Sequence, residues 1–249
     1  MCLITFAWRP DHDRPLIVAA NRDEFYARPT AAAAEWEDAP GVYAGRDLEA
    51  GGTWLGIGPR GRFAAVTNIR AVASRPAPRS RGELCAAYLA GELKLDDYAR
   101  QVCDRAQAYG GFNLLLGDGS NLYYLNSHSR VPEALAAGVY GLSNAALDTP
   151  WPKLLKAREG FAALLEASPE QLMALLSDPT LAKDADLPET GVGLATERLL
   201  SSVFIASPTY GTRASTVLVA WADGRRTLVE RSFGPSGGRL GEVSFEIPD

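Results

Sequence analysis

The chain opens with MCLITFAWRPDHDRPLIVAANRDE over residues 1–24, two apolar runs separated by a polar segment. Asp11-His12-Asp13 between the runs is typical of a turn, so we expect an antiparallel hairpin. Asn21-Arg22-Asp23-Glu24 stands at the far end of its second strand. In such a pair the end of the second strand returns beside the start of the first. The opening sequence therefore predicts that Asp23 lies near Cys2.

Beyond this hairpin the chain alternates between strand-like and helix-like segments. A second hairpin is expected over residues 53–68, and Asp118-Gly119-Ser120-Asn121 is a turn signal between two further strands. Capping boxes predict helices that begin at Ser80, with Glu83, and at Ser168, with Gln171. The remaining expected elements are helices at 96–108 and after Pro150, and strands at 113–116, 122–125, 201–206, 213–221, 226–233 and 242–247. Their order predicts the α+β class.

Length and composition indicate a folded chain with a substantial core. The 249 residues are 47% hydrophobic, which suits one large domain. We therefore expect a single domain over residues 1–249. The segment 70–81 contains Pro76, Pro78 and four arginines, which predicts an exposed, mobile connector.

The charge balance excludes some classes of partner. Lys plus Arg total 25 and Asp plus Glu total 30, a net charge of −5, whereas nucleic-acid binders usually carry a strongly basic face. No apolar run approaches the roughly 18 residues that a membrane span needs. The first eight residues are too short for a signal peptide, because Arg9 follows at once. We expect a cytoplasmic protein with a small-molecule ligand and neither nucleic acid nor a membrane span.

The cysteine and histidine counts argue against a framework of disulfides or metal ligands. The three cysteines are Cys2, Cys85 and Cys103, too few and odd in number for a disulfide scaffold. With only His12 and His128 in addition, no metal site is expected. Cys85 and Cys103 fall on the apolar faces of expected helices and are interpreted as inert core thiols.

Cys2 is the candidate nucleophile because of its place in the chain. Methionine aminopeptidases remove Met1 before a small second residue, which would give one residue both a thiol and a free α-amine. These groups have reference pKa values of about 8.5 and about 7.7–8.0, so both exchange protons near neutral pH. The amine can then serve as the base for its own side chain. The alternative is that Cys2 is a small apolar residue at a strand start.

Other polar residues could surround this thiol. A carboxylate at Asp23 could hold the α-amine, and an arginine could orient that carboxylate or a substrate. Asn68 and Asn144 each end an expected strand, where a side-chain amide can stabilise an oxyanion. Arg213 precedes a β-rich run and could face the same cleft. The alternatives are a solvated turn at 21–24, ordinary turn chemistry for the asparagines and a sheet-edge position for the arginine.

In combination, these motifs resemble the NRDE-motif family, whose eukaryotic members are called transport and Golgi organisation proteins. Met1-Cys2-Leu3-Ile4 and Asn21-Arg22-Asp23-Glu24 match in order with four later stretches, which are Gly52-Thr53-Trp54-Leu55-Gly56, Val66-Thr67-Asn68, Gly141-Leu142-Ser143-Asn144 and Tyr210-Gly211-Thr212-Arg213. That family in turn resembles N-terminal-nucleophile (Ntn) hydrolases of the penicillin acylase and bile-salt hydrolase kind, which implies an αββα four-layer sandwich.

The resemblance also implies roles for individual residues. It makes Cys2 the nucleophile and Asp23 the carboxylate that orients the amine. Asn68 and Asn144 match the amides that stabilise the oxyanion, and Arg213 matches a distal arginine. The substrate-binding candidates are Asn21, Arg22 and Arg213. One departure stands out, since the hydrolases have an arginine three residues before the aspartate and this chain has Ala20.

Two functions from different classes are therefore expected. One is a cysteine amidohydrolase acting on a non-peptide C–N bond, which requires no cofactor. The other is a protein that binds and transfers haem, acyl-CoA or lipid, as the family resemblance implies. For haem, the available soft or imidazole ligands are Cys2, His12 and His128, and no Cys-x-x-Cys-His attachment motif occurs.

Overall fold

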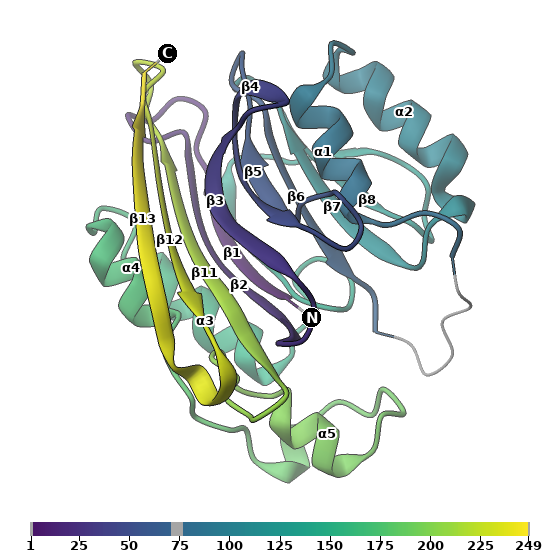
Figure 1. Ribbon diagram of the computed structural model, residues 1–249, viewed down its shortest axis with the longest axis vertical. Helices are drawn as coiled ribbons and strands as arrows, with labels where there is room; N and C mark the ends of the chain where they lie inside the picture. The colour runs from purple at the N-terminus through teal and green to yellow at the C-terminus, as the bar shows by residue number, and fades with distance from the viewer. Residues whose placement is uncertain (1, 71–76, 249) are drawn as a thin grey trace. The chain divides into compact units, whose positions relative to one another are not determined.

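The computed structural model describes residues 2–70 and 77–248, which form two compact units (Figure 1). The first unit comprises the chain up to Ala27, Arg70 and the segment from Ala137 onward. The second comprises residues 28–69 and the described residues up to Ala136. Much of the connector expected at 70–81 lies outside the described residues, because these omit 71–76. The mobility of this connector therefore stays a prediction. The single-domain organisation over residues 1–249 also stays a prediction.

The first unit is built on a six-stranded antiparallel sheet with the order β10-β1-β2-β11-β12-β13. The predicted opening hairpin is confirmed, since β1 and β2 pair from Cys2 opposite Arg22 to Trp8 opposite Leu16. The long strand β11 pairs with the other side of β2 and places Thr212 opposite Asp23. The strands are β1 (Cys2–Trp8), β2 (Leu16–Phe25), β10 (Gly138–Leu142), β11 (Tyr210–Ala220), β12 (Arg226–Phe233) and β13 (Arg239–Ile247).

Helices cover one face of this sheet (Figure 1). Strand side chains alternate between faces, so Ala7, Ile17 and Ala19 share the face that packs on α3 and α4. The helices are α3 (Pro152–Ala162), α4 (Pro169–Leu175) and α5 (Leu194–Leu199). The predicted capping box of Ser168 and Gln171 is confirmed at the start of α4.

The second unit has a seven-stranded antiparallel sheet in the order β3-β4-β5-β6-β7-β8-β9. Its core lies between the sheet and two helices, α1 (Gly82–Ala90) and α2 (Leu95–Arg105), and includes Cys85. The strands are β3 (Thr30–Trp36), β4 (Ala39–Asp47), β5 (Leu55–Ile57), β6 (Phe63–Asn68), β7 (Phe112–Gly117), β8 (Leu122–Asn126) and β9 (Glu133–Ala134). In the described parts of both units, no helix has the length and apolar character needed to cross a membrane.

Glycines explain why one sequence motif belongs to the fold of the second unit. A Cβ atom on Gly52 would stand 2.3 Å from the backbone of Gly82, and one on Gly56 would stand 2.5 Å from Ala44. Trp54 lies over Gly45, where an added Cβ would stand 2.2 Å from its ring. The stretch Gly52-Thr53-Trp54-Leu55-Gly56 therefore packs strands closely against each other and against α1.

Two expected features are wrong. Residues 201–206 do not form a strand, because side chains of the first sheet take their backbone groups: Asn21 binds the Val203 carbonyl and Thr212 binds the Ile205 N–H. The N-cap of α1 is Arg81 rather than Ser80, and it has no side-chain cap. Glu83 is drawn away from a capping box because it pairs with Arg79.

Candidate active site

Cys2 begins β1 and lies directly opposite Arg22 of β2. As a residue it is half-buried, but its thiol lies deep enough that burial raises its pKa, and the negative charge of Asp23 adds to this. The Arg22 charge and a hydrogen bond from the backbone N–H of Asp23 lower the thiol pKa. The thiol is thus held in its protonated form by desolvation, beside a backbone donor that favours the thiolate.

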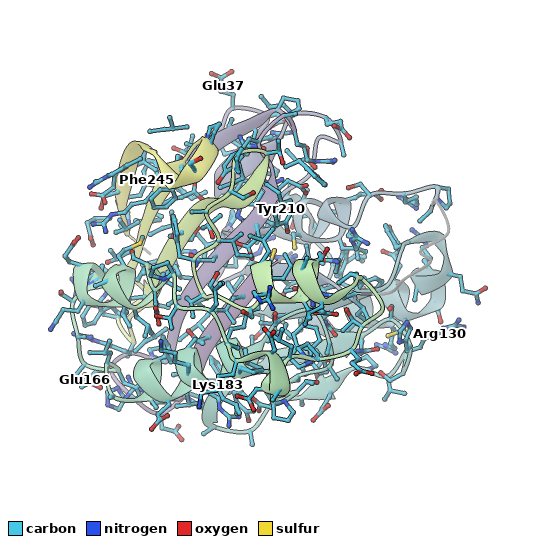
Figure 2. All side chains as sticks on the ribbon, turned by 90° about the horizontal axis from the view of Figure 1, so that it is seen from below. Glu37, Arg130, Glu166, Lys183, Tyr210 and Phe245 are labelled. Carbon is cyan, nitrogen blue, oxygen red and sulfur yellow. The ribbon has the colours of Figure 1, made fainter. Side chains whose placement is uncertain are left out.

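Asp23 is almost fully buried, with 1% of its surface exposed. Its Oδ1 accepts a 2.8 Å hydrogen bond from the Thr212 hydroxyl, and its carbonyl oxygen accepts one from the Tyr210 hydroxyl at 3.2 Å. Tyr210 is labelled in Figure 2, and burial raises its pKa, so its hydroxyl stays a donor. Burial also raises the pKa of the Asp23 carboxyl, while the charge of Lys153 lowers it. Strand β11 therefore holds this carboxyl in one orientation.

Asn144 reaches the same region through the residue before it. Strand β10 pairs with β1, and Ser143 follows its last residue. The Ser143 hydroxyl donates to the Cys2 carbonyl at 3.0 Å and lies 3.4 Å from Asn144 Oδ1. The carbonyl of Asn144 accepts from the Arg70 backbone N–H at 2.8 Å. The side-chain oxygen and the backbone carbonyl of Asn144 are thereby both held next to the start of β1.

Asn21 lies in the same motif but is held by the interior of the first unit. Its Nδ2 donates to the carbonyls of Leu176 and Val203 at 2.9 and 2.8 Å. Its Oδ1 accepts from the Ser215 hydroxyl at 2.6 Å. Because donors and acceptor are all used, Asn21 fastens two loops to the sheet.

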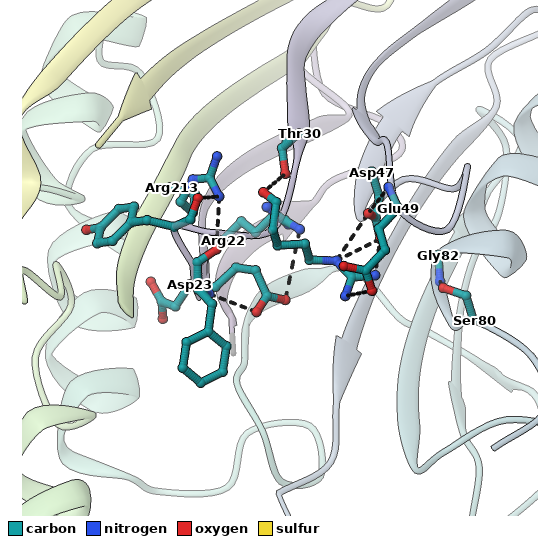
Figure 3. Close-up of polar contacts among 12 residues, drawn as sticks. Arg22, Asp23, Thr30, Asp47, Glu49, Ser80, Gly82 and Arg213 are labelled. Atoms are coloured by element: carbon teal, nitrogen blue, oxygen red, sulfur yellow. Dashed lines mark hydrogen bonds and ion pairs between the residues drawn. The ribbon is translucent and has the colours of Figure 1, made fainter. Parts of the chain in front are cut away.

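Arg213 sits at a β-bulge between Thr212 and Ala214, where the register of β11 against β2 shifts. A bulge turns its side chain out of the regular alternation. Its guanidinium donates to the carbonyls of Phe25 and Tyr26 at 3.0 and 3.2 Å. Figure 3 shows Arg213 with Arg22 and Asp23 at this end of the sheet.

Gly211, which precedes the bulge, is required by close packing. A Cβ atom there would stand 2.4 Å from both the Ile205 carbonyl oxygen and the Tyr26 hydroxyl. The stretch Tyr210-Gly211-Thr212-Arg213 therefore combines a backbone constraint with three side chains that hold the end of β2.

Asn68 belongs to the second unit, where it ends β6 opposite Phe112. Its expected role as an oxyanion donor stays a prediction.

Three charged residues of this region were missed by the sequence analysis: Lys153, Arg70 and Glu197. Arg70 and Glu197 form a buried ion pair with Nη1 and Oε2 2.6 Å apart, and the Arg70 guanidinium lies 4.6 Å from the Trp151 ring centre. Lys153 is 4% exposed, and its pKa is lowered by burial although Asp23 and Cys2 raise it. The sequence contains one indication that Lys153 is unusual: it falls in the first turn of the helix expected after Pro150, where acidic residues are preferred.

His12 lies apart from this cluster within the first unit. His12 follows β1 in the turn at the opposite end from Cys2, and seven strand residues at about 3.3 Å each separate the ends by roughly 20 Å. His12 Nδ1 accepts from the Arg14 backbone N–H, and its Nε2 lies 3.7 Å from Glu166. His128 is exposed and belongs to the second unit. Across the described residues, no three His, Cys, Asp or Glu side chains are grouped as metal ligands would be.

Comparisons with known proteins agree over nearly the whole chain. Residues 1–235 match the family described as Transport and Golgi organisation 2. The Transport and Golgi organization protein 2 homologs of Bos taurus and Homo sapiens are 39% and 38% identical, each over 94% of this chain and 93% of their own length. The Drosophila melanogaster protein is 30% identical over 94% of this chain and 92% of its own.

Among solved structures, the Caenorhabditis elegans N-acylethanolamine-hydrolyzing acid amidase ortholog is similar with a TM-score of 0.50. It is 10% identical in sequence, and the match covers 88% of this chain and 92% of that one. At this identity the likeness concerns the fold. The predicted Ntn-hydrolase-like α+β fold is confirmed.

Proposed function

Because the chain belongs to the Transport and Golgi organisation 2 family and has an Ntn-hydrolase-like fold, we propose that it is a cysteine hydrolase acting on a non-peptide amide bond. The observation that carries the proposal is the environment of Cys2, which lies opposite Arg22 at the end of β2, beside the buried Asp23 carboxyl that Thr212 holds in place. The choice of an amide is supported by the similar solved structure, which is that of an acid amidase ortholog.

The proposed reaction begins after removal of Met1, which leaves the α-amine on Cys2. The thiol sulfur forms a bond to the amide carbonyl carbon while its proton passes to the α-amine. That proton then moves to the leaving nitrogen, the C–N bond breaks and a thioester remains on Cys2. Water attacks the thioester, gives a proton back through the amine to the sulfur, and the carboxylic acid leaves.

The neighbouring residues have matching roles in this proposal. Asp23, held by Thr212, orients the α-amine. Asn144 donates its amide N–H to the oxyanion, because Ser143 lies against the oxygen end of its side chain. For Asn68, which belongs to the second unit, the role of a second amide stays a prediction from the sequence. Arg22 lies opposite Cys2 and contacts the substrate, with Arg213 as the more distant arginine, whereas Asn21 supports the strand.

The first test is the state and reactivity of residue 2. Intact-mass spectrometry should show the loss of Met1, and incubation with N-acyl p-nitroanilides should add the mass of the acyl group to Cys2. Cys2→Ala should abolish both acylation and nitroaniline release. Cys103→Ala, on α2 of the second unit, is the matched control and should keep wild-type rates. Retained Met1, or hydrolysis by Cys2→Ala at the wild-type rate, would contradict the proposal.

The haem-binding alternative is restricted by the position of His12. Since His12 and Cys2 lie at opposite ends of β1, they do not share one iron. Within the first unit, haem ligation would thus rest on Cys2 or on His12 alone. Titration with haemin tests it: a Soret shift lost in Cys2→Ala or His12→Ala favours haem binding, and its persistence in both variants and in His128→Ala removes these residues from that function.

A further inference from the structure

Lys153 is a buried cation whose ammonium group has no hydrogen-bonded partner among the described residues. Its side chain is 4% exposed, and its Nζ makes no hydrogen bond with any described residue. An ammonium group has three donors, and leaving it without hydrogen bonds in the protein interior is strongly unfavourable. The charge of Asp23 acts on this ammonium, whereas Oδ1 of the Asp23 carboxyl accepts its hydrogen bond from Thr212.

The helix that carries Lys153 adds to the positive potential. Lys153 is in the first turn of α3, which has no acidic residue and whose N-cap, Trp151, makes no side-chain cap. The unsatisfied N–H groups of a helix start carry a partial positive charge that favours anions and disfavours cations. A buried lysine in this turn breaks a local rule of helix stability, and such conflicts concentrate at functional sites.

The start of α3 is fixed next to Cys2. Leu154 packs with Leu3, which follows Cys2 in the chain, and an added Cβ on Gly141 would stand 2.8 Å from Leu154 Cδ1. Trp151 lies under the Arg70 guanidinium, and the Arg70 backbone binds Asn144. The charges of Asp23, Arg70 and Cys2 all act on Lys153, so its ammonium lies among them.

We propose that Lys153 and the first turn of α3 bind the anionic group, a carboxylate or a phosphate, of the substrate whose amide bond reaches Cys2. The inference rests on the proposed function and names its substrate class: amides that carry a negative charge near the scissile bond. A bound anion would complete the hydrogen bonds of Lys153 and offset its burial. The neutral amides used to detect acylation would bind without this contact.

Two alkylating reagents test the anion site without any substrate. Iodoacetate and iodoacetamide both alkylate a thiolate at their CH2 carbon with loss of iodide, and they differ in carrying a carboxylate or a neutral amide. The ratio of their rates at Cys2 cancels the thiolate fraction, so it reports the local preference for an anion. Peptide mass spectrometry separates Cys2 from Cys103, which serves as an internal reference.

The ratio should be higher at Cys2 than at Cys103 and should fall roughly tenfold in Lys153→Met, which removes the charge at similar volume. Lys153→Arg should keep most of the preference. Lys156→Met is the matched control on the same helix, because Lys156 is exposed and pairs with Asp178, and its ratio should equal that of the wild type. An equal ratio at Cys2 and Cys103, or one unchanged in Lys153→Met, would overturn the proposal.

A second measurement needs no variant and separates the two kinds of anion. At constant ionic strength, inorganic phosphate and acetate should each be tested for slowing the reaction of wild-type Cys2 with iodoacetate. The stronger protector identifies a phosphate or a carboxylate site, and no protection by either would refute the anion site. If the protein did not hydrolyse amides, the proposed reaction would be refuted. The alkylation measurements would still decide whether the anion site exists.

Discussion

At the scale of single residues, the candidate site depends on a few buried charges whose partners come from distant parts of the chain. Arg70 pairs with Glu197, 127 residues away, and the Thr190 backbone N–H donates to the other carboxylate oxygen of Glu197 at 2.8 Å. Burial lowers the pKa of Arg70, and Glu197 opposes this shift. Removing one partner of such a pair leaves an uncompensated charge inside the protein.

Arg70→Ala should therefore lower the free energy of unfolding by about 3 kcal/mol, because Glu197 would remain buried without its cation. Urea unfolding followed by circular dichroism measures the change. The control is Arg198→Ala, whose exposed pair with Asp184 is screened by solvent and should contribute far less to the free energy of unfolding. Equal decreases in the free energy of unfolding of the two variants would show that the buried Arg70–Glu197 pair stabilises the fold no more than an exposed pair does.

At the scale of elements, the sequence predicted the hairpin of β1 and β2 because two apolar runs flank a polar turn. It missed β3, whose sequence Thr30-Ala31-Ala32-Ala33-Ala34-Glu35-Trp36 is rich in alanine and has little intrinsic preference for a strand. Pairing with β4 overrides that preference. The pattern at 201–206 misled in the opposite direction, since that segment contains the β-favouring run Val203-Phe204-Ile205 but its backbone is bound by side chains.

The packing of β11 at Gly211 gives a prediction at this scale. Gly211→Ala should lower the unfolding midpoint, with a cost of roughly 1–3 kcal/mol, because the new methyl group meets the Ile205 carbonyl and the Tyr26 hydroxyl at 2.4 Å. It should also slow the alkylation of Cys2, since β11 orients Asp23. Gly241→Ala in β13 has open space around its Cβ and is the control. A wild-type midpoint for Gly211→Ala would refute this reading.

At the scale of the whole molecule, buried ionisable groups make stability depend on pH. Burial raises the pKa of Asp23 above its value of 3.8 in the unfolded chain. Between these two values the folded state binds more protons than the unfolded state, so stability falls as pH rises through that window. At neutral pH the buried Asp23 carboxyl thus lowers the stability of the folded protein.

Asp23→Asn should remove this dependence. Urea unfolding at intervals from pH 4 to pH 7 should show a smaller fall in the free energy of unfolding for the variant than for the wild type. At neutral pH the variant should also be inactive in the acylation assay, because an amide cannot take the role of the carboxylate towards the amine. If the free energies of unfolding of the two proteins changed equally with pH, the destabilisation assigned to the buried Asp23 carboxyl would be contradicted.

The sequence by itself determined the α+β class, the opening hairpin and the pairing of Cys2 with the end of β2. It could do so because hydrophobic alternation and turn residues are local properties. Only the tertiary structure decided that Asn21 holds loops, that Arg213 stands on a bulge and that Lys153 and Arg70 lie beside Cys2 and Asp23. These outcomes depend on burial and on partners more than 60 residues apart, which no local pattern encodes.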